Sequence, residues 1–391
     1  MTIIVLIILA GISISLVIGN NGIMQKAVKG REDYTGAAIN EQMSLNKIED
    51  YIENESSELI SIEEAKQKGI LTEKTSVIDT NGNIIRVPQG FKIAADSGLN
   101  VTEGIVIEDN DIKTGIGNNR GNQYVWVPVG NGIKKNDGTT VDITLGRYAF
   151  ADGTNDKDTN GNVLAKGTST LKQDAVNYTQ EVEISYDNKR YKELATSRVG
   201  VASNGTDGLN TTALNLKGFV DSVKANGGYY IARYEASYGT DGKANSKVSN
   251  SYSGSNVEGK LWNNITQINA ATVSRNLYTG VNSDLINSYA WDTAIVYIQN
   301  FSGDTDYSRQ NSLNTSLANT GVNNDEKCKI NDMASNTMEW TTEYCTYTDS
   351  SHAYPCASRG GSYSSYYTYG RAYYYAEFSY DHVSFRCALY M

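Results

Sequence analysis

Basic residues, proline, histidine and cysteine are all scarce in this chain of 391 residues. Lysine and arginine number 34 against 44 aspartates and glutamates, which gives a net charge of −10. Nucleic-acid binding needs a basic patch to contact the phosphates, and no cluster of lysine and arginine is present, so we expect no nucleic-acid partner. The 3 prolines and the 39% of hydrophobic residues argue against extensive disorder.

The four cysteines all lie in the last quarter of the chain, at Cys328, Cys345, Cys356 and Cys387. None belongs to a Cys-x-x-Cys pair, so a zinc site is not expected. An even number of clustered cysteines favours disulfides in an exported protein. We expect a Cys345–Cys356 disulfide across a short polar loop, and four free buried thiols are the alternative.

Catalytic patterns are also lacking. Neither histidine, His352 or His382, lies in a nucleophile pattern with serine or cysteine, and no glycine-rich phosphate loop follows a strand. Glu339 is expected to be a buried structural group rather than a lone base. The stretch 156–162, "DKDTNGN", opens like a calcium loop, but its twelfth position is Gly167 where a bidentate glutamate is needed. We therefore expect no enzyme and no cofactor, with calcium as a minor alternative.

Residues 2–18, "TIIVLIILAGISISLVI", carry no charge. As a helix they would be roughly 25 Å long, close to the ~30 Å of a membrane's hydrocarbon core, so we expect a membrane helix. Lys26, Lys29 and Arg31 follow it, and the positive-inside rule would place the rest of the chain in the cytoplasm. We expect the opposite orientation, because the segment starts abruptly at Met1 as if a basic leader preceded it.

The first 50 residues resemble the N-terminus of type IV pilin-like proteins of Gram-positive bacteria, in which an apolar helix continues as an amphipathic one. Here Ile48, Tyr51 and Ile52 share one helical face. The resemblance assigns residues 1–55 to such a helix and its extension, although the glutamate near the start of those proteins is absent. It implies a bacterial surface protein that is membrane-anchored through residues 2–18 or pilus-associated, with other pilin subunits as partners.

Residues 56–118 read as a small stalk or hairpin module. "SIEEAKQKG" predicts a short helix that Ser61 caps, with Glu64 as its capping-box partner and Gly69 as its end. "DTNGNIIRV" predicts a hairpin whose tight turn is Asn81-Gly82.

From residue 119 to 391 the pattern becomes strands, long polar loops and two separate helices, which predicts an α+β domain. Residues 123–130 read as a strand that ends at a proline, and a second strand follows Gly227. The two helices present apolar faces made of Leu216, Phe219, Val220 and Val223, and of Trp291, Ala294, Ile295 and Ile298. Trp126, Trp291 and Trp340 are expected in or near the core.

Six segments of this region resemble, in order, the formylglycine-generating enzyme (sulfatase-modifying factor) family. They are "YVWVPVG", "GGYYIARYEAS", "AWDTAIVYI", "INDMASNTMEWTTEY", "ASRGGSY" and "FRCAL". The resemblance implies a C-type-lectin-like fold for residues 119–391. Family members carry a cysteine a few residues after "RGGS" and another five further on, where this chain has Ser365 and Gly370. A serine cannot replace a copper-binding thiolate, so the family's activity is not expected.

Tyrosine fills eight of the 22 positions from 363 to 384. Every residue of this segment except Glu377 can be encoded by AAC or AAT with its first two adenines changed to any base. The segment resembles the C-terminal variable region of the variable proteins of diversity-generating retroelements, which have the same fold and are rewritten at adenines. The resemblance implies a fixed scaffold on either side, at residues 359–362 and 385–389, and a variable binding face between them.

A tyrosine side chain offers a large amphipathic contact surface, and only a few of its torsion angles have to be fixed on binding. Serine adds hydrogen bonds that can adapt to different partners. We therefore expect most of the segment to be exposed on one face and to bind an unknown protein or glycan; a structural aromatic cluster is the alternative. The expected binding residues are Tyr363, Ser364, Tyr366, Tyr367, Tyr369, Tyr373, Tyr374, Tyr375, Ser379, Tyr380, Asp381 and His382. The predicted function is a non-catalytic surface-displayed ligand-binding protein; the alternative is a structural minor pilin or cell-surface subunit.

Overall fold

The structure is a computed structural model that describes residues 59–195, 210–252, 257–310, 316–322, 324–349, 351–363 and 368–391. Leu59–Met391 form one compact unit. Its described residues form mostly sheets with four α-helices, so the predicted α+β class is confirmed. The expected membrane helix at residues 2–18 lies outside the described residues. Within the described part, no helix is long and apolar enough to cross a membrane.

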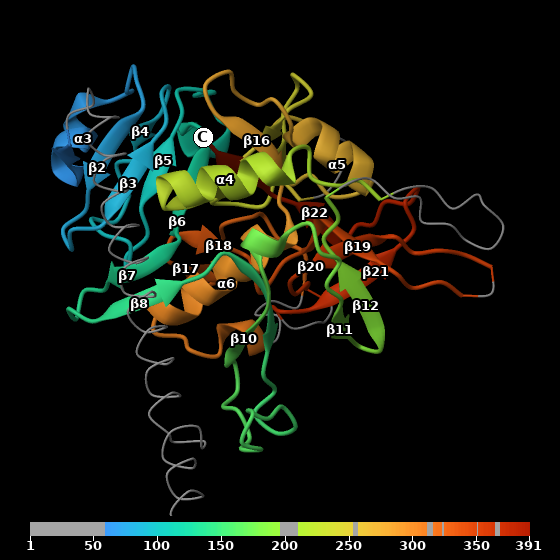
Figure 1. Ribbon diagram of the computed structural model, residues 1–391. Helices are drawn as coiled ribbons and strands as arrows, with labels where there is room; N and C mark the ends of the chain where they lie inside the picture. Colours follow the sequence, from blue (N-terminus) through green and yellow to red (C-terminus); the bar gives the residue numbers. More distant parts are fainter. Residues whose placement is uncertain are drawn as a thin grey trace, which may run out of the picture. The chain divides into compact units, whose positions relative to one another are not determined.

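A first sheet of six antiparallel strands has the order β16-β23-β13-β6-β5-β4 (Figure 1). Its strands are β4 (Lys92–Ile93), β5 (Val106–Glu108), β6 (Gln123–Pro128), β13 (Gly228–Ala232), β16 (Asn282–Leu285) and β23 (Cys387–Tyr390). β6 and β13 match the strands predicted at these positions. The last strand along the chain, β23, lies between β16 and β13, so the C-terminal residues belong to the interior of the sheet.

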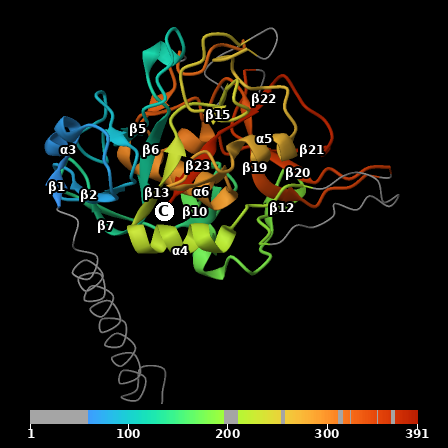
Figure 2. The same cartoon turned by 90° about the horizontal axis from the view of Figure 1, so that it is seen from above.

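A second sheet has the order β11-β12-β19-β20-β21, and β22 pairs with β19 in parallel. Its strands are β11 (Ile184–Tyr186), β12 (Lys189–Lys192), β19 (Met338–Cys345), β20 (Cys356–Arg359), β21 (Arg371–Tyr374) and β22 (Val383–Phe385). Residues 371–374 of the tyrosine-rich segment therefore form the edge strand β21, and its last two residues, Val383 and Ser384, belong to β22 (Figure 2).

The sequence predicts a separate module for residues 56–118, and the structure corrects this boundary. β1 (Ile60–Ser61), β2 (Thr75–Ile78) and β3 (Ile84–Val87) form a small sheet next to helix α3 (Ile62–Lys68). However, β4 and β5 of the same region extend the first sheet beyond β6. The apolar residues of both regions share one core, so residues 59–118 are part of the larger domain.

The local signals in this region are partly accurate. The side chain of Ser61 caps α3 by accepting a hydrogen bond from the Glu64 backbone N–H at 3.1 Å, and Gly69 ends the helix with a φ of 69°. The hairpin between β2 and β3 also forms, but its turn is longer than predicted. Ile78 pairs with Ile84, and the carboxylate of Asp79 organises the turn by accepting from two backbone N–H groups.

The two predicted helices of the larger region are α4 (Leu216–Asn226) and α6 (Ser288–Phe301). Gly227 ends α4 in the left-handed conformation, at a φ of 75°. α6 is buried on almost every side rather than on one face, because it packs against β6 of the first sheet and β19 of the second (Figure 1). Its polar residue Asp292 therefore lies in the interior.

Helix α5 (Gln267–Ser274) was not predicted. Thr266 caps its start by accepting from the Asn269 backbone N–H at 3.3 Å. Its buried positions include Gln267, Ala270 and Ala271. Small and polar residues on the buried side leave no clear apolar stripe, which explains why the periodicity of the sequence does not reveal this helix.

The remaining described elements are two-stranded ribbons and single turns of 3₁₀-helix. The ribbons are β7 (Gly130–Lys134) with β8 (Thr140–Ile143), β9 (Gly146–Phe150) with β10 (Ser169–Asp174), β14 (Ser237–Tyr238) with β15 (Ala244–Asn245), and β17 (Glu326–Lys327) with β18 (Ile330–Asn331). The 3₁₀ turns are η1 (Gly117–Asn119), η2 (Ala175–Asn177) and η3 (Tyr307–Arg309).

The predicted core tryptophans are confirmed, since Trp126, Trp291 and Trp340 are at most 1% exposed. The expected Cys345–Cys356 disulfide is not formed, and all four cysteines are free and buried. Tyr344, not Cys345, lies opposite Cys356 in the β19–β20 pair. Neighbouring residues of a strand point to opposite faces, so the two thiols lie on opposite sides of the second sheet.

Candidate binding face

The antiparallel pair of β20 and β21 positions the tyrosine-rich segment. Arg359 of the "RGGS" motif lies opposite Arg371, and Ala357 lies opposite Tyr373. Because side chains alternate along a strand, Tyr373 and Tyr374 point to opposite faces. Tyr373 packs with the small cluster around Tyr191, whereas Tyr374 packs against the main core.

Five aromatic side chains gather on the first of these faces, and we call them the outer cluster: Tyr347, His352, Tyr354, Tyr373 and Tyr375. Ring centroids are 4.4 Å apart for Tyr354 and Tyr375, and 4.7 Å apart for Tyr347 and Tyr373. The ring of Tyr354 also lies 5.3 Å from that of Tyr373. The four tyrosines are half-buried and His352 is exposed, so the cluster leaves aromatic surface in contact with solvent.

Three members of the outer cluster come from the connection between β19 and β20, residues 346–355, which continues beyond the second sheet in Figures 1 and 2. The carboxylate of Asp349 accepts hydrogen bonds from the His352 backbone N–H at 2.7 Å and from the Tyr354 hydroxyl at 2.7 Å. These bonds, together with the Tyr354–Tyr347 backbone bond of 3.1 Å, fix the described residues of the hairpin as a platform.

Tyr347, His352 and Tyr354 are not among the binding residues expected from the sequence. Their segment, "TYTDSSHAYP", has two tyrosines and two serines in ten residues, and it is also rich in polar residues. Its tyrosines and serines are a signal that the expectation of a disulfide loop leaves out. The pairing of β20 with β21 brings the two segments together.

On the opposite face lies a second group, which we call the core-side cluster: Trp340, Tyr374, Tyr380 and His382. Tyr374 and Tyr380 have ring centroids 4.3 Å apart, and Tyr374 lies 5.3 Å from Trp340. The Tyr374 hydroxyl and His382 Nε2 share a hydrogen bond of 3.0 Å, and His382 Nδ1 lies 3.1 Å from Asp381. These tyrosines therefore cover a buried tryptophan while their polar edges remain accessible.

The other expected binding residues are scattered between surface and interior. Tyr369 is half-buried between the ring of Tyr186, at 5.2 Å, and the Arg309 guanidinium, at 3.8 Å. Tyr363 is half-buried, whereas Ser379 and Asp381 are exposed. Ser364, Tyr366 and Tyr367 lie outside the described residues.

The structure thus corrects the expectation that most of residues 363–384 are exposed. The described tyrosines are half-buried, and seven other residues of the segment are buried: Thr368, Gly370, Arg371, Ala372, Ala376, Val383 and Ser384. Every residue of the two flanks, 359–362 and 385–389, is buried. Within the segment, exposed and buried positions are interleaved.

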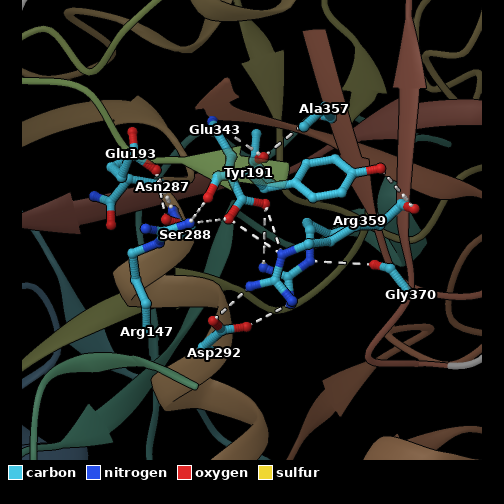
Figure 3. A network of polar contacts seen from close by, with 12 residues as sticks. Arg147, Tyr191, Glu193, Asn287, Ser288, Asp292, Glu343, Ala357, Arg359 and Gly370 are labelled. Atoms are coloured by element: carbon cyan, nitrogen blue, oxygen red, sulfur yellow. Dashed lines mark hydrogen bonds and ion pairs between the residues drawn. The ribbon is translucent and has the colours of Figure 1, made fainter. Parts of the chain in front are cut away.

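Arg371 is buried and belongs to a polar network on the same face of β21 as Tyr373, two residues along the strand. Figure 3 shows the part of this network around Asp292, Glu343 and Arg359. Arg371 donates to Glu343 at 3.0 Å and to Asp292 at 3.0 Å. Arg359 also donates to Asp292, and Arg147 donates to Glu343 at 2.6 Å. A buried charge must be paired to be tolerated, so this network fixes the positions of β19, β20, β21 and α6.

The pKa values of two buried glutamates, Glu343 and Glu193, are shifted in opposite directions. Burial alone would raise the pKa of Glu343, but the charges of Arg371, Arg359 and Arg147 lower it to about 2. Glu193 lies at the edge of the network and accepts hydrogen bonds from the N–H and hydroxyl of Ser288, the first residue of α6. Burial raises the pKa of Glu193 to about 6.

The "DMASNTMEW" motif also has a packing role. Glu339 is buried and accepts a hydrogen bond of 2.6 Å from Arg386 Nε. Burial raises the pKa of Glu339, although the charge of Arg386 opposes the shift. Asp332 and Asn336 both have positive φ angles, 60° and 62°, and Asn336 donates to the buried carboxylate of Glu235. The first part of the motif, residues 332–337, therefore forms a tight turn before β19, and the motif is bonded to Glu235 and Arg386 outside it.

Metal ligands do not gather among the described residues, where no group of three or more His, Cys, Asp or Glu side chains is placed to hold an ion. In the stretch that resembles a calcium loop, Asp158 accepts from the backbone N–H groups of Asn160 and Asn162. A bridge between Lys157 and Val163 closes this stretch as a hairpin turn.

No family model matches the chain, and no curated protein matches it. Among solved structures, the "Crystal Structure of CarF" aligns at 14% identity with a TM-score of 0.31. That alignment covers 42% of this chain and 87% of CarF. A similarity of this size has no bearing on fold or function, which have to be argued from the residues themselves.

The geometry of the face is that of an open contact surface. The aromatic rings lie side by side on two hairpins, and the buried ionic network lies next to them on the same face of the second sheet. A hollow of about 720 Å³ lies elsewhere, beside β16, and is lined by residues such as Lys74, Gln89, Tyr278 and Asn282. Half-buried aromatic rings on a rigid support are suited to holding a partner by stacking and hydrogen bonding.

Proposed function

We propose that this chain is a non-catalytic ligand-binding protein whose binding face consists of the outer cluster and the accessible edges of the core-side cluster. The observation that carries the proposal is the outer cluster, five contacting aromatic side chains that remain partly exposed. Aromatic rings of this kind normally pack in the core or bind a partner. The platform of hydrogen bonds around Asp349 pre-organises them, which lowers the entropic cost of binding.

The proposal extends to the fold and to the origin of the segment. The order of the six motifs supports a C-type-lectin-like domain similar to formylglycine-generating enzymes. The interleaving of exposed and buried positions supports a variable protein of a diversity-generating retroelement, provided that variation is restricted to the exposed positions. The apolar residues 2–18 support display at a bacterial surface, either by a membrane anchor or on a pilus.

Diversification predicts a specific gene arrangement. A near-copy of codons 359–391 should lie close to the gene, next to a reverse transcriptase. We expect adenines in that copy at the codons of accessible residues such as Tyr375, Ser379 and Asp381. We expect no adenine at the first two bases of the codon for Arg371. Replacing this arginine would leave the buried carboxylates of Asp292 and Glu343 short of a partner. Sequencing the locus tests this, and a copy with adenines at the Arg371 codon would contradict it.

Binding itself is tested with the double variant Tyr354→Ser/Tyr375→Ser. We expect peptides selected on the wild-type domain from a phage-displayed library of random 12-residue sequences to bind this variant at least tenfold more weakly. The free energy of unfolding should fall by less than ~2 kcal/mol, because both rings are only half-buried. Biolayer interferometry and chemical denaturation provide the two measurements.

The matched control is Tyr252→Ser, which removes a tyrosine that is 43% exposed outside the outer cluster. Its affinity for the selected peptides should equal that of the wild type. Selected peptides that bind the double variant and the wild type equally well would overturn the proposed face and favour a structural surface subunit.

A further inference from the structure

A carboxylate lies beside the outer cluster. Asp349 is exposed, and it accepts a hydrogen bond of 2.7 Å from the Tyr354 hydroxyl. Residues 346–358, which contain Asp349, include no lysine or arginine. Hydrogen bonds from the Tyr354 hydroxyl and from two backbone N–H groups lower the pKa of Asp349, so its negative charge persists beside the rings.

One end of the outer cluster already holds a cation from this chain. Lys189 Nζ lies 4.9 Å from the ring centroid of Tyr373 and 5.4 Å from that of Tyr347. A cation over an aromatic face is attracted by the quadrupole of the ring. This internal contact demonstrates that the cluster presents ring faces at a distance and orientation that suit an ammonium group.

The other end holds no such cation. Among the described residues, no lysine or arginine lies over the ring of Tyr354 or Tyr375. Those two rings are the closest pair in the cluster, and their hydroxyls are 2.8 Å apart. The end with two adjacent tyrosines therefore combines aromatic surface with the carboxylate of Asp349, and no lysine or arginine of the described residues lies over its rings.

We propose that the outer cluster binds a protein partner through a lysine or arginine side chain placed over Tyr354 and Tyr375, with Asp349 beside it. This inference rests on the proposed function and names the chemistry of its partner. A neutral glycan would gain stacking but nothing from the net negative charge, whereas a basic peptide gains both. The net charge of −10 of the whole chain has the same sign and steers a basic partner toward this protein.

The test uses the same phage-displayed 12-residue library, and the composition of the selected peptides is the first readout. Some peptides selected on the wild-type domain will fail to bind the double variant Tyr354→Ser/Tyr375→Ser. These peptides should contain more lysine and arginine than the unselected library does. Their synthetic copies should bind about tenfold more weakly in 0.5 M than in 0.05 M NaCl, because salt screens exposed charges.

Charge variants provide the second readout. Asp349→Asn removes the carboxylate beside the rings and should weaken the synthetic peptides by roughly two- to fivefold, as expected for one exposed ion pair. The matched control Glu63→Gln removes one exposed carboxylate from α3 and should leave the affinity unchanged.

The outcomes separate this inference from the function on which it rests. Peptides that require Tyr354 and Tyr375 but are neutral or acidic, and that tolerate salt, would overturn the cationic partner and leave the binding face in place. A library that yields no peptide sensitive to the loss of these tyrosines would overturn both.

Discussion

Replacing Glu343 with glutamine should lower the free energy of unfolding by about 3–5 kcal/mol, the usual cost of breaking a buried ion pair from one side. Glu343 is fully buried and accepts from Arg147 at 2.6 Å and from Arg371 at 3.0 Å. Without it, Asp292 is the remaining carboxylate that directly pairs with the arginines of the network. Chemical denaturation followed by circular dichroism measures the loss.

The control for this variant is Glu377→Gln, which neutralises an exposed carboxylate in the tyrosine-rich segment. Its free energy of unfolding should differ from that of the wild type by less than ~0.5 kcal/mol, as for most surface substitutions. Equal stabilities of the two variants would mean that the network is not a support for the second sheet.

The same substitution should change how stability depends on pH. The pKa of Glu343 falls from its ordinary 4.5 to about 2 in the folded protein, so its contribution is complete above pH 4.5 and is lost as the pH falls toward 2. Glu193 acts in the opposite direction, because its pKa rises to about 6 and its contribution is lost as the pH rises from 4.5 through 6. Glu343→Gln should flatten only the acidic limb of the profile.

This network was not predictable from the sequence, and the reason is physical. Arg147, Asp292, Glu343, Arg359 and Arg371 come from five different elements, and each alone has the composition of a surface residue. Only the pairing of β19, β20 and β21 over α6 brings them together. Asp292 gives the clearest sign in retrospect, because a lone carboxylate in the apolar stretch "AWDTAIVYI" has to be paired if that helix is buried.

Local signals, by contrast, were accurate because they depend on a few adjacent residues. Ser61 and Gly69 mark the two ends of α3 at the residues that the sequence predicts, through hydrogen bonding at the N-cap and a positive φ at the C-cap. The tyrosine content of residues 363–384 selected the segment that supplies Tyr373 and Tyr375 of the outer cluster. It did not distinguish Tyr373 from Tyr374, because which of them points to the core depends on the register with β20.

The largest single effect on the core is expected from Trp340→Ala. Trp340 is fully buried, and its indole Nε1–H donates to the Ile265 carbonyl oxygen at 2.8 Å. Truncating a buried tryptophan typically costs ~3–5 kcal/mol, and here Tyr374 and Tyr380 also lose the ring on which they pack. A melting temperature equal to that of the wild type would contradict this assignment of the motif.

Trp340→Phe is the informative partner of that variant. It keeps an aromatic ring under Tyr374 but leaves the Ile265 carbonyl without its donor, so we expect a smaller loss of about 1–3 kcal/mol. The outer cluster lies on the other face of β21. Among the described residues, the rings that contact Trp340 are those of Tyr374 and Tyr380, which do not belong to the outer cluster. Folded Trp340→Phe should therefore bind the selected peptides almost as well as the wild type, whereas Tyr354→Ser/Tyr375→Ser should not. If Trp340→Phe instead lost binding at unchanged stability, the binding face would have to be moved to the core-side cluster.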